Sequence, residues 1–226
     1  MMDETDPMFA AEVVDPTVDF LEPLATGGAL EFAVGSGRIA LPLAERRVRV
    51  YGIDISPTVL EQLHAKPGAD RVATTLGDYT TTTVDGAFSL VYLVWNSINN
   101  VTTQDGQVAA FQNAAAHLEP GGRFVIEVGV PQLRRLPPGQ NVVPFDVTPE
   151  HLGFDEYDVV TQRLVSHHYW PARGKQGSGE FRYVWPSELD LMARLAGLEL
   201  EDRFSGWHRE PFTAQSTSHV SVWTRG

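Results

Sequence analysis

Residues 29–37 read ALEFAVGSG, an apolar run that ends in two glycines one residue apart. The apolar part predicts a buried strand, and the glycines predict a sharp turn into a helix over residues 37–45. Such a turn brings backbone N–H groups and the start of a helix close to a ligand, because glycine has no Cβ in the way. Many α/β proteins have a turn of this kind for purely structural reasons, so further residues must decide the function.

Strand and helix patterns alternate around this stretch. An opening helix is expected over residues 16–26, with Asp15 as its N-cap and Pro16 at its first position. Helices are also expected after Ser56 and over residues 104–118. Four more strands are expected, at residues 47–54, 71–76, 88–94 and 123–128. This alternation predicts a doubly wound, mainly parallel, Rossmann-like α/β sheet.

The pattern changes after Pro131. Residues 131–149 are rich in Pro, Gly and Gln and predict a loop, and antiparallel strands are expected over 157–170 and 179–185. A helix over 186–196 and strands over 198–204 and 219–224 complete a sheet of seven strands. We therefore expect a single domain over residues 1–226, with an antiparallel insertion after the fifth strand. The inserted segment, residues 131–185, is expected to form a lid over the substrate.

The composition limits the partners of the chain. With 226 residues, 42% of them hydrophobic, the chain can bury a sizeable core, and no apolar run is long enough to cross a membrane. The absence of cysteine excludes disulfides and thiolate chemistry. A net charge of −12 argues against nucleic acid and favours a small-molecule acceptor. Residues 1–6 lack the features of a signal peptide, so a cytoplasmic protein is expected, as a monomer or homodimer.

Two carboxylates follow later strands at the same expected edge of the sheet. Asp54 ends the second strand, seventeen residues after Gly37, where a carboxylate can accept both hydroxyls of a ribose. Asp78 follows Gly77 after the third strand and could accept from the amine of adenine, although an aspartate in a turn is also common. These residues indicate a ligand that contains a nucleoside.

The residue after the glycine turn separates two such ligands. The third glycine of a dinucleotide fingerprint would fall at position 38 or 40, but Arg38 and Ala40 stand there. A bulky Arg38 is awkward where a pyrophosphate needs close approach to the backbone. S-adenosylmethionine (SAM) is therefore favoured over a nicotinamide cofactor. A nicotinamide-dependent reductase stays the alternative.

The order of these motifs resembles that of class I SAM-dependent methyltransferases. The resemblance includes the LEPGG motif at residues 118–122 and the segment FSLVYLVWN at residues 88–96, and it covers about residues 15–224. The segments RYVWPSEL at residues 182–189 and WHREPF at residues 207–212 are similar to those of a bacterial, largely actinomycete subgroup. That subgroup methylates small molecules. The resemblance implies an acceptor of the secondary-metabolite type.

The resemblance also implies roles for individual residues. Glu31 and the turn of Gly35 and Gly37 would hold the methionine end of SAM, and Asp54 would hold the ribose. Around the adenine, Ile55 would pack on the ring, Asp78 after Gly77 would meet the amine, and Tyr79 would lie beside the ring. The residues bordering the sulfonium and the acceptor would be Val94, Trp95 and Asn96.

The chain departs from the family pattern in two places. Ala33 stands where the family usually has glycine, and no tyrosine precedes the opening helix. A protein that binds SAM without methyl transfer is therefore a second alternative.

Three histidines are candidates for a general base, which an oxygen acceptor would need and a neutral amine would not. His167 and His168 lie on an expected strand of the insertion, where adjacent side chains point to opposite faces, so at most one of them can face the substrate. His208 lies next to Trp207 near the C-terminus. An exposed position without a catalytic role is the alternative for each. No His and Asp residues have the spacing of metal ligands, so no metal is expected.

Overall fold

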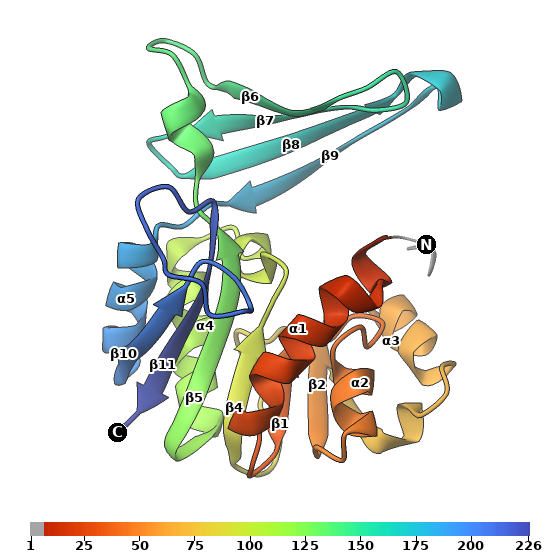
Figure 1. The fold of residues 1–226 in the computed structure, drawn as a ribbon, viewed down its shortest axis with the longest axis vertical. Coiled ribbons are helices and arrows are strands. Elements are labelled where there is room, and N and C mark those ends of the chain that lie inside the picture. Colours follow the sequence, from red (N-terminus) through yellow and green to blue (C-terminus); the bar gives the residue numbers. More distant parts are fainter. Residues whose placement is uncertain (1–6) are drawn as a thin grey trace.

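The computed structural model describes residues 7–226, and a seven-stranded sheet forms its centre with the order β10-β11-β5-β4-β1-β2-β3 (Figure 1). Five neighbouring strands are parallel: β1 (Ala29–Phe32), β2 (Val50–Asp54), β3 (Val72–Leu76), β4 (Phe88–Leu93) and β5 (Leu118–Gly129). At one edge, β11 (Ser218–Arg225) is antiparallel to β5 and to β10 (Leu198–Phe204). The predicted mainly parallel α/β sheet is confirmed.

Helices cover both faces of this sheet. One face carries α1 (Ala11–Leu21), α2 (Ala40–Glu45) and α3 (Pro57–His64), and the other carries α4 (Gln104–His117) and α5 (Pro186–Leu195). Two separate apolar clusters result, one with Leu43 and Leu90 at its centre and one with Phe111 and Trp223. All six residues of β4 are buried, as expected for a strand between two helical layers. None of the helices within residues 7–226 is long and apolar enough to cross a membrane.

Several boundaries in this part differ from the prediction by three to five residues, and two of them have a clear physical reason or consequence. The opening helix begins at Ala11 instead of residue 16, so Asp15 is no N-cap and Pro16 lies inside the helix. Its buried face includes Val14 and Val18, and burying both sides of Pro16 outweighs the loss of one backbone hydrogen bond. β5 begins at Leu118, before the predicted turn, and shows a register shift against β4 there. The signal-peptide interpretation concerned residues 1–6, which lie outside the described part.

A second sheet, called the small sheet below, follows β5. It consists of β6 (Val142–Val147), β7 (Leu152–Asp158), β8 (Arg163–Trp170) and β9 (Lys175–Arg182), all antiparallel in this order. The prediction of an antiparallel insertion is confirmed, but β6 lies within the stretch predicted as a loop. The strand predicted over 157–170 corresponds to β8, and it includes only the last two residues of β7 and the turn between them. Figure 1 shows the small sheet extending over the edge of the large sheet at which β1 and β4 end.

Candidate functional site

The turn after β1 has an unusual backbone. Ala33, Gly35 and Gly37 all have positive φ angles, of 55°, 58° and 82°. A Cβ built on Gly37 would come within 2.9 Å of Leu41, so this glycine is needed for packing inside the protein. A Cβ on Gly35 would meet nothing nearer than 3.9 Å, and Gly35 lines a cavity of about 120 Å³. The space at Gly35 is therefore open to a ligand.

Asp54 fixes this turn to the end of β2. One carboxylate oxygen accepts from the Gly35 N–H at 2.8 Å, and the other accepts from the Ser56 N–H at 2.9 Å. The backbone carbonyl of Asp54 accepts from Gly77 at 2.9 Å, which ties in the loop after β3. Each carboxylate oxygen can accept a further hydrogen bond. Asp54 thus combines a structural role with free acceptor capacity.

Glu31 is a buried carboxylate at the end of β1 and lines the same cavity as Gly35. Tyr92 donates its hydroxyl proton to Glu31 at 2.8 Å. Burial raises the pKa of Glu31 to about 8, and the hydrogen bond from Tyr92 and the charge of Arg38 only partly offset this. Burying a carboxylate costs free energy unless the charge is compensated. A cationic group in the adjoining cavity would supply that compensation.

A second cavity of about 320 Å³ lies at the ends of β3 and β4, with Ile55, Asp78 and Tyr79 in its wall. Ile55 is 70% exposed at its edge, while Tyr79 is buried and donates to the backbone carbonyl of Ser97 at 2.8 Å. Asp54 ends the strand between the two cavities, since β2 lies between β1 and β3. Three carboxylates therefore follow one another along this edge, those of Glu31, Asp54 and Asp78. The side chains along this edge fit SAM.

The loop after β4 is strained. Trp95 and Asn96 both have φ of 58°, which non-glycine residues adopt at a cost of about 1–2 kcal/mol each. Two contacts with β5 hold them: Glu127 accepts from the Trp95 N–H at 2.8 Å, and Asn96 accepts from the Gly129 N–H at 2.6 Å. Strain that neighbours enforce in this way is common at functional sites. Val94 and Trp95 line the cavity at Glu31.

Trp95 lines three cavities, two of which lie near Arg38. On one side lies the cavity at Glu31 and Gly35, and on another a space of about 200 Å³ bordered by Arg38, Trp207 and His208. The guanidinium of Arg38 stacks on the Trp95 ring at 4.5 Å from its centroid. Arg38 therefore forms part of the wall between these two spaces. His208 is exposed and lies in this side cavity, apart from His167 and His168.

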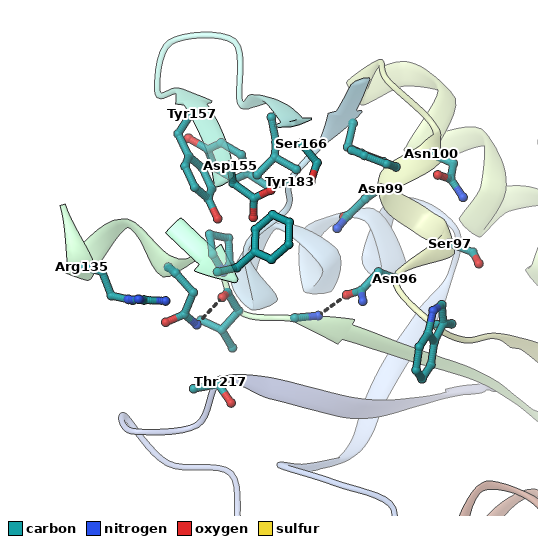
Figure 2. Close-up of a pocket in the computed structure, with 18 of the residues that line it drawn as sticks. Asn96, Ser97, Asn99, Asn100, Arg135, Asp155, Tyr157, Ser166, Tyr183 and Thr217 are labelled. Carbon is teal, nitrogen blue, oxygen red and sulfur yellow. Dashed lines mark hydrogen bonds between the residues drawn. The ribbon is translucent and has the colours of Figure 1, made fainter. Parts of the chain in front are cut away.

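A large cavity, of about 1050 Å³, lies between the small sheet and the loop after β4 (Figure 2). Asp155, Tyr157 and Ser166 come down from the small sheet, and Tyr183 follows it; Asn96 and Asn99 come from the opposite wall. Rings of Phe145, Phe181 and Trp95 complete much of the lining. Because Trp95 and Ser97 line both this cavity and the one at Glu31, the two spaces adjoin.

The two adjacent histidines point to opposite faces of β8. His168 lines the large cavity, and burial together with neighbouring His151 lowers its pKa. His167 stacks on Phe154 on the other face, with ring centroids 4.8 Å apart, and Glu156 lies 3.4 Å from its Nε2. A base acting within the large cavity can therefore be His168 but not His167. His208 does not line the large cavity, and the side cavity that it borders shares only Trp95 with the large one.

Sequence reasoning missed most of the lining of the large cavity, including Asp155, and two residues near the N-terminus. Met8 and Phe9, in the short 3-10 helix Pro7–Phe9, line the cavity at Glu31, at the end of the chain where a tyrosine was expected. Asp155 lies in the large cavity, and burial raises its pKa despite a hydrogen bond from Ser166. An acidic residue in the middle of an insertion carries no motif, so only the strand pairing of the small sheet reveals it.

Comparisons with known proteins agree with this arrangement. Residues 29–122 match the family model described as a methyltransferase domain. The CcbJ methyltransferase from Streptomyces caelestis has a similar solved structure with a TM-score of 0.82, and it is 32% identical over 93% of this chain and 89% of its own. This chain is a class I SAM-dependent methyltransferase.

Two further relatives have more specific names. Cypemycin N-terminal methyltransferase from a Streptomyces species is 27% identical over 213 residues, which cover 90% of this methyltransferase and 85% of the relative. CalS10 from Micromonospora echinaspora, an amino pentose methyltransferase solved with SAM bound, has a TM-score of 0.71. At 23% identity over 96% of this chain and 89% of its own, CalS10 shows the shared fold.

Proposed function

We propose that this methyltransferase transfers the methyl group of SAM to an amine nitrogen of a small-molecule acceptor. The acceptor binds in the large cavity, and the small sheet, with its connections over residues 131–185, serves as the lid that shapes it. Bound SAM supplies a methyl group on a positively charged sulfur. Since the transfer is a displacement in line with the departing sulfur, much of the catalysis comes from holding the acceptor in the right orientation.

The cofactor contacts follow the order of the strands. Glu31 holds the methionine ammonium, with Ala33, Gly35 and Gly37 forming the turn beside it. Asp54 accepts from the ribose. Around the adenine, the proposed contacts are Ile55, Gly77, Asp78 and Tyr79. The proposed boundary between the methyl group and the acceptor consists of Val94, Trp95 and Asn96.

The proposal of an amine acceptor rests on Asp155. Its carboxylate faces a cavity lined by aromatic rings, including Tyr157 and Phe145, and no Lys is part of that lining. Arg135 also lines the cavity, as the one Lys or Arg side chain among the described residues of that lining. A carboxylate among aromatic rings suits an ammonium group, which gains a charged hydrogen bond and cation–π contacts. The name of the cypemycin relative also specifies methylation of an N-terminus, which is an amine.

Methylation of a hydroxyl is the second candidate, because His168 lines the same cavity. Its lowered pKa keeps the imidazole neutral near pH 7, as a general base requires. A panel of paired acceptors, each amine matched by the alcohol of the same skeleton, decides between the two with labelled SAM and mass spectrometry of the products. Methylated amines are expected. Products from the alcohols alone would contradict the amine proposal.

Asp54→Ala is expected to weaken SAM binding by about 1.5–3 kcal/mol, roughly 10- to 150-fold in Kd, through the loss of charge-assisted hydrogen bonds. Part of the loss comes from Gly35, whose N–H donates to Asp54 at 2.8 Å and would be released. Isothermal titration with SAM measures the effect, with Asp70→Ala, an exposed aspartate outside the cavities, as control. Unchanged affinity in Asp54→Ala would show that the ribose assignment is wrong.

Ala33→Gly is expected to stabilise the protein by about 0.5–1 kcal/mol and to keep or improve SAM affinity. The φ of 55° at Ala33 costs an L-residue about 1–2 kcal/mol, which exceeds the extra chain entropy of glycine. Thermal unfolding with and without SAM tests both parts. A large loss of affinity in a folded variant would reveal a contact between the Ala33 methyl group and the cofactor.

A further inference from the structure

Five polar side chains form a continuous chain of hydrogen bonds along the small sheet: Asp155, Ser166, His168, His151 and Asp146. Asp155 and Ser166 are register partners on β7 and β8 and are hydrogen-bonded through their side chains. Ser166 Oγ lies 3.2 Å from His168 Nε2, and His168 Nδ1 lies 3.0 Å from His151 Nε2. His151 Nδ1 lies 2.7 Å from an oxygen of Asp146. This hydrogen-bond chain begins in the large cavity, where the acceptor is proposed to bind, and ends at Asp146, whose side chain is 39% exposed.

The surroundings of the two imidazoles are closely packed. His151 and His168 stack with ring centroids 5.1 Å apart, and Trp170 stacks on both. Gly153 lies opposite His168 on β7, and a Cβ there would come within 2.3 Å of the Phe145 ring and 3.0 Å of His151. This glycine makes room for the rings. The rings of Phe145 and Trp170 pack against the two imidazoles, and all four ring nitrogens have partners within the group.

Every hydrogen bond between these five side chains can be made in either of two directions. In one arrangement His168 and His151 both carry the proton on Nδ1, and hydrogen bonds run from Asp155 toward Asp146. In the other arrangement both carry it on Nε2, and each bond runs in the opposite direction. A neutral imidazole has one donor and one acceptor nitrogen, so both arrangements leave every group satisfied. Passing from the first to the second moves one proton from Asp155 to Asp146.

We propose that this hydrogen-bond chain is a proton relay, which removes the proton of the acceptor ammonium group and releases it to solvent at Asp146. The proposal rests on the amine acceptor proposed above. Asp155 touches the acceptor and is the catalytic residue, while His168 and His151 act through it. An ammonium nitrogen has no lone pair, so it must lose a proton before it can attack a methyl group.

The ammonium nitrogen gives one proton to the Asp155 carboxylate. With both imidazoles starting in the Nδ1-protonated form, Asp155 passes it to Ser166, whose hydroxyl proton goes to Nε2 of His168. The Nδ1 proton of His168 goes to Nε2 of His151, and the Nδ1 proton of His151 goes to Asp146. Both imidazoles then carry their proton on Nε2 and return to the Nδ1 form before the next turnover. The freed lone pair of the amine forms the new C–N bond. The C–S bond breaks, and its electron pair stays on the sulfur of the product.

The charged groups around His168 come from two strands and one turn. Asp155 on β7 favours the protonated imidazole, while His151 in the turn after β6 and His167 on β8 disfavour it. Burial and His151 together hold the pKa of His168 below its usual range. A neutral His168 at pH 7 can accept the proton from Ser166, which the relay requires.

His151→Phe tests the relay because phenylalanine keeps the ring stacking and removes both hydrogen bonds. The rate of methylation of the best amine in the acceptor panel is measured from pH 6.5 to 9.5 with saturating SAM. We expect kcat to fall about 10-fold at pH 7, and the deficit to shrink toward pH 9.5, where the free amine exists in solution. KM should change little. Asp155→Asn should lose about 100-fold at pH 7.

His167→Phe is the matched control, since His167 lies on the other face of the same strand and outside the relay. It should follow the wild-type pH profile, as should His167→Ala. If His151→Phe also followed the wild-type profile on a methylated amine, the relay would be refuted while the amine proposal stood.

A second measurement separates the two proposals and needs no turnover. Nitrogen NMR of ¹⁵N-histidine-labelled protein, without acceptor, reports which ring nitrogen of His151 carries the proton. The relay predicts that Asp155→Asn changes this tautomer balance at His151, which Asp155 does not touch directly. If no amine in the panel were methylated, the amine proposal would fail, and an unchanged His151 signal would then refute the relay as well.

Discussion

Glu31→Gln is expected to make the ligand-free protein more stable at pH 8 and to weaken its binding of SAM. Burial raises the pKa of Glu31 from 4.5 to about 8 in the folded protein. Between these values the folded protein keeps a proton that the unfolded chain releases. The contribution of Glu31 to stability is therefore complete below pH 4.5 and is lost as the pH rises toward 8.

The loss has a measurable size. Each pKa unit corresponds to about 1.4 kcal/mol, so wild type should lose on the order of 2–4 kcal/mol between pH 5 and pH 8 through this group. Glutamine keeps the hydrogen bond from Tyr92 and does not ionise, so Glu31→Gln should escape this loss. Urea unfolding at both pH values tests it, with exposed Glu61→Gln on α3 as control. The same pH slope in wild type and Glu31→Gln would contradict the buried-charge argument.

Cofactor binding should respond in the opposite direction. If Glu31 holds the methionine ammonium, its carboxylate must be ionised in the complex, and binding then releases a proton below pH 8. The affinity of wild type for SAM should rise as the pH increases toward 8, whereas the affinity of Glu31→Gln should be weaker and flat. Titration calorimetry in buffers of different ionisation enthalpy measures the released proton. A protein that stores an unfavourable charge at its ligand site gives up stability for function.

The parallel core was predictable because its signals are local. Apolar strands such as residues 88–94, glycine turns and a capping Ser56 each determine structure over a few residues, and the alternation determines the sheet. Boundaries that depend on tertiary packing were not predictable. Pro16 suggested a helix start, but buried residues on both sides of it hold the helix together.

The small sheet shows the limit more clearly. β6 contains Pro144, lies at the edge of its sheet and is largely exposed, so its sequence resembles a loop. The cofactor edge could be anticipated because parallel strands all bring their ends to one side. The acceptor side could not, because the position of Asp155 opposite Ser166 depends on a strand register that only long-range pairing fixes.

Arg182→Met is expected to destabilise the protein by about 3–5 kcal/mol, because it removes one partner of a buried ion pair. Arg182 donates to Glu188 at 2.6 Å, and only 6% and 14% of the two side chains are exposed. The guanidinium also donates to Gln107 on α4 and to Gln162 at the start of β8. Arg182 therefore attaches the C-terminal end of β9 to α4 and α5, which cover one face of the large sheet. Without it, a carboxylate and two amides lose their buried partner.

The small sheet offers a matched control for this variant. Arg163 pairs with Glu180 between β8 and β9, but both side chains are more than half exposed, so Arg163→Met should cost less than about 1 kcal/mol. Replacing both members of the buried pair, Arg182→Met with Glu188→Met, should recover much of the loss, since no uncompensated charge remains. Urea unfolding compares the four proteins. Equal costs for Arg182→Met and Arg163→Met would show that the attachment of the small sheet does not depend on this cluster, and that the apolar contacts of Tyr157 and Tyr183 below the sheet hold it instead.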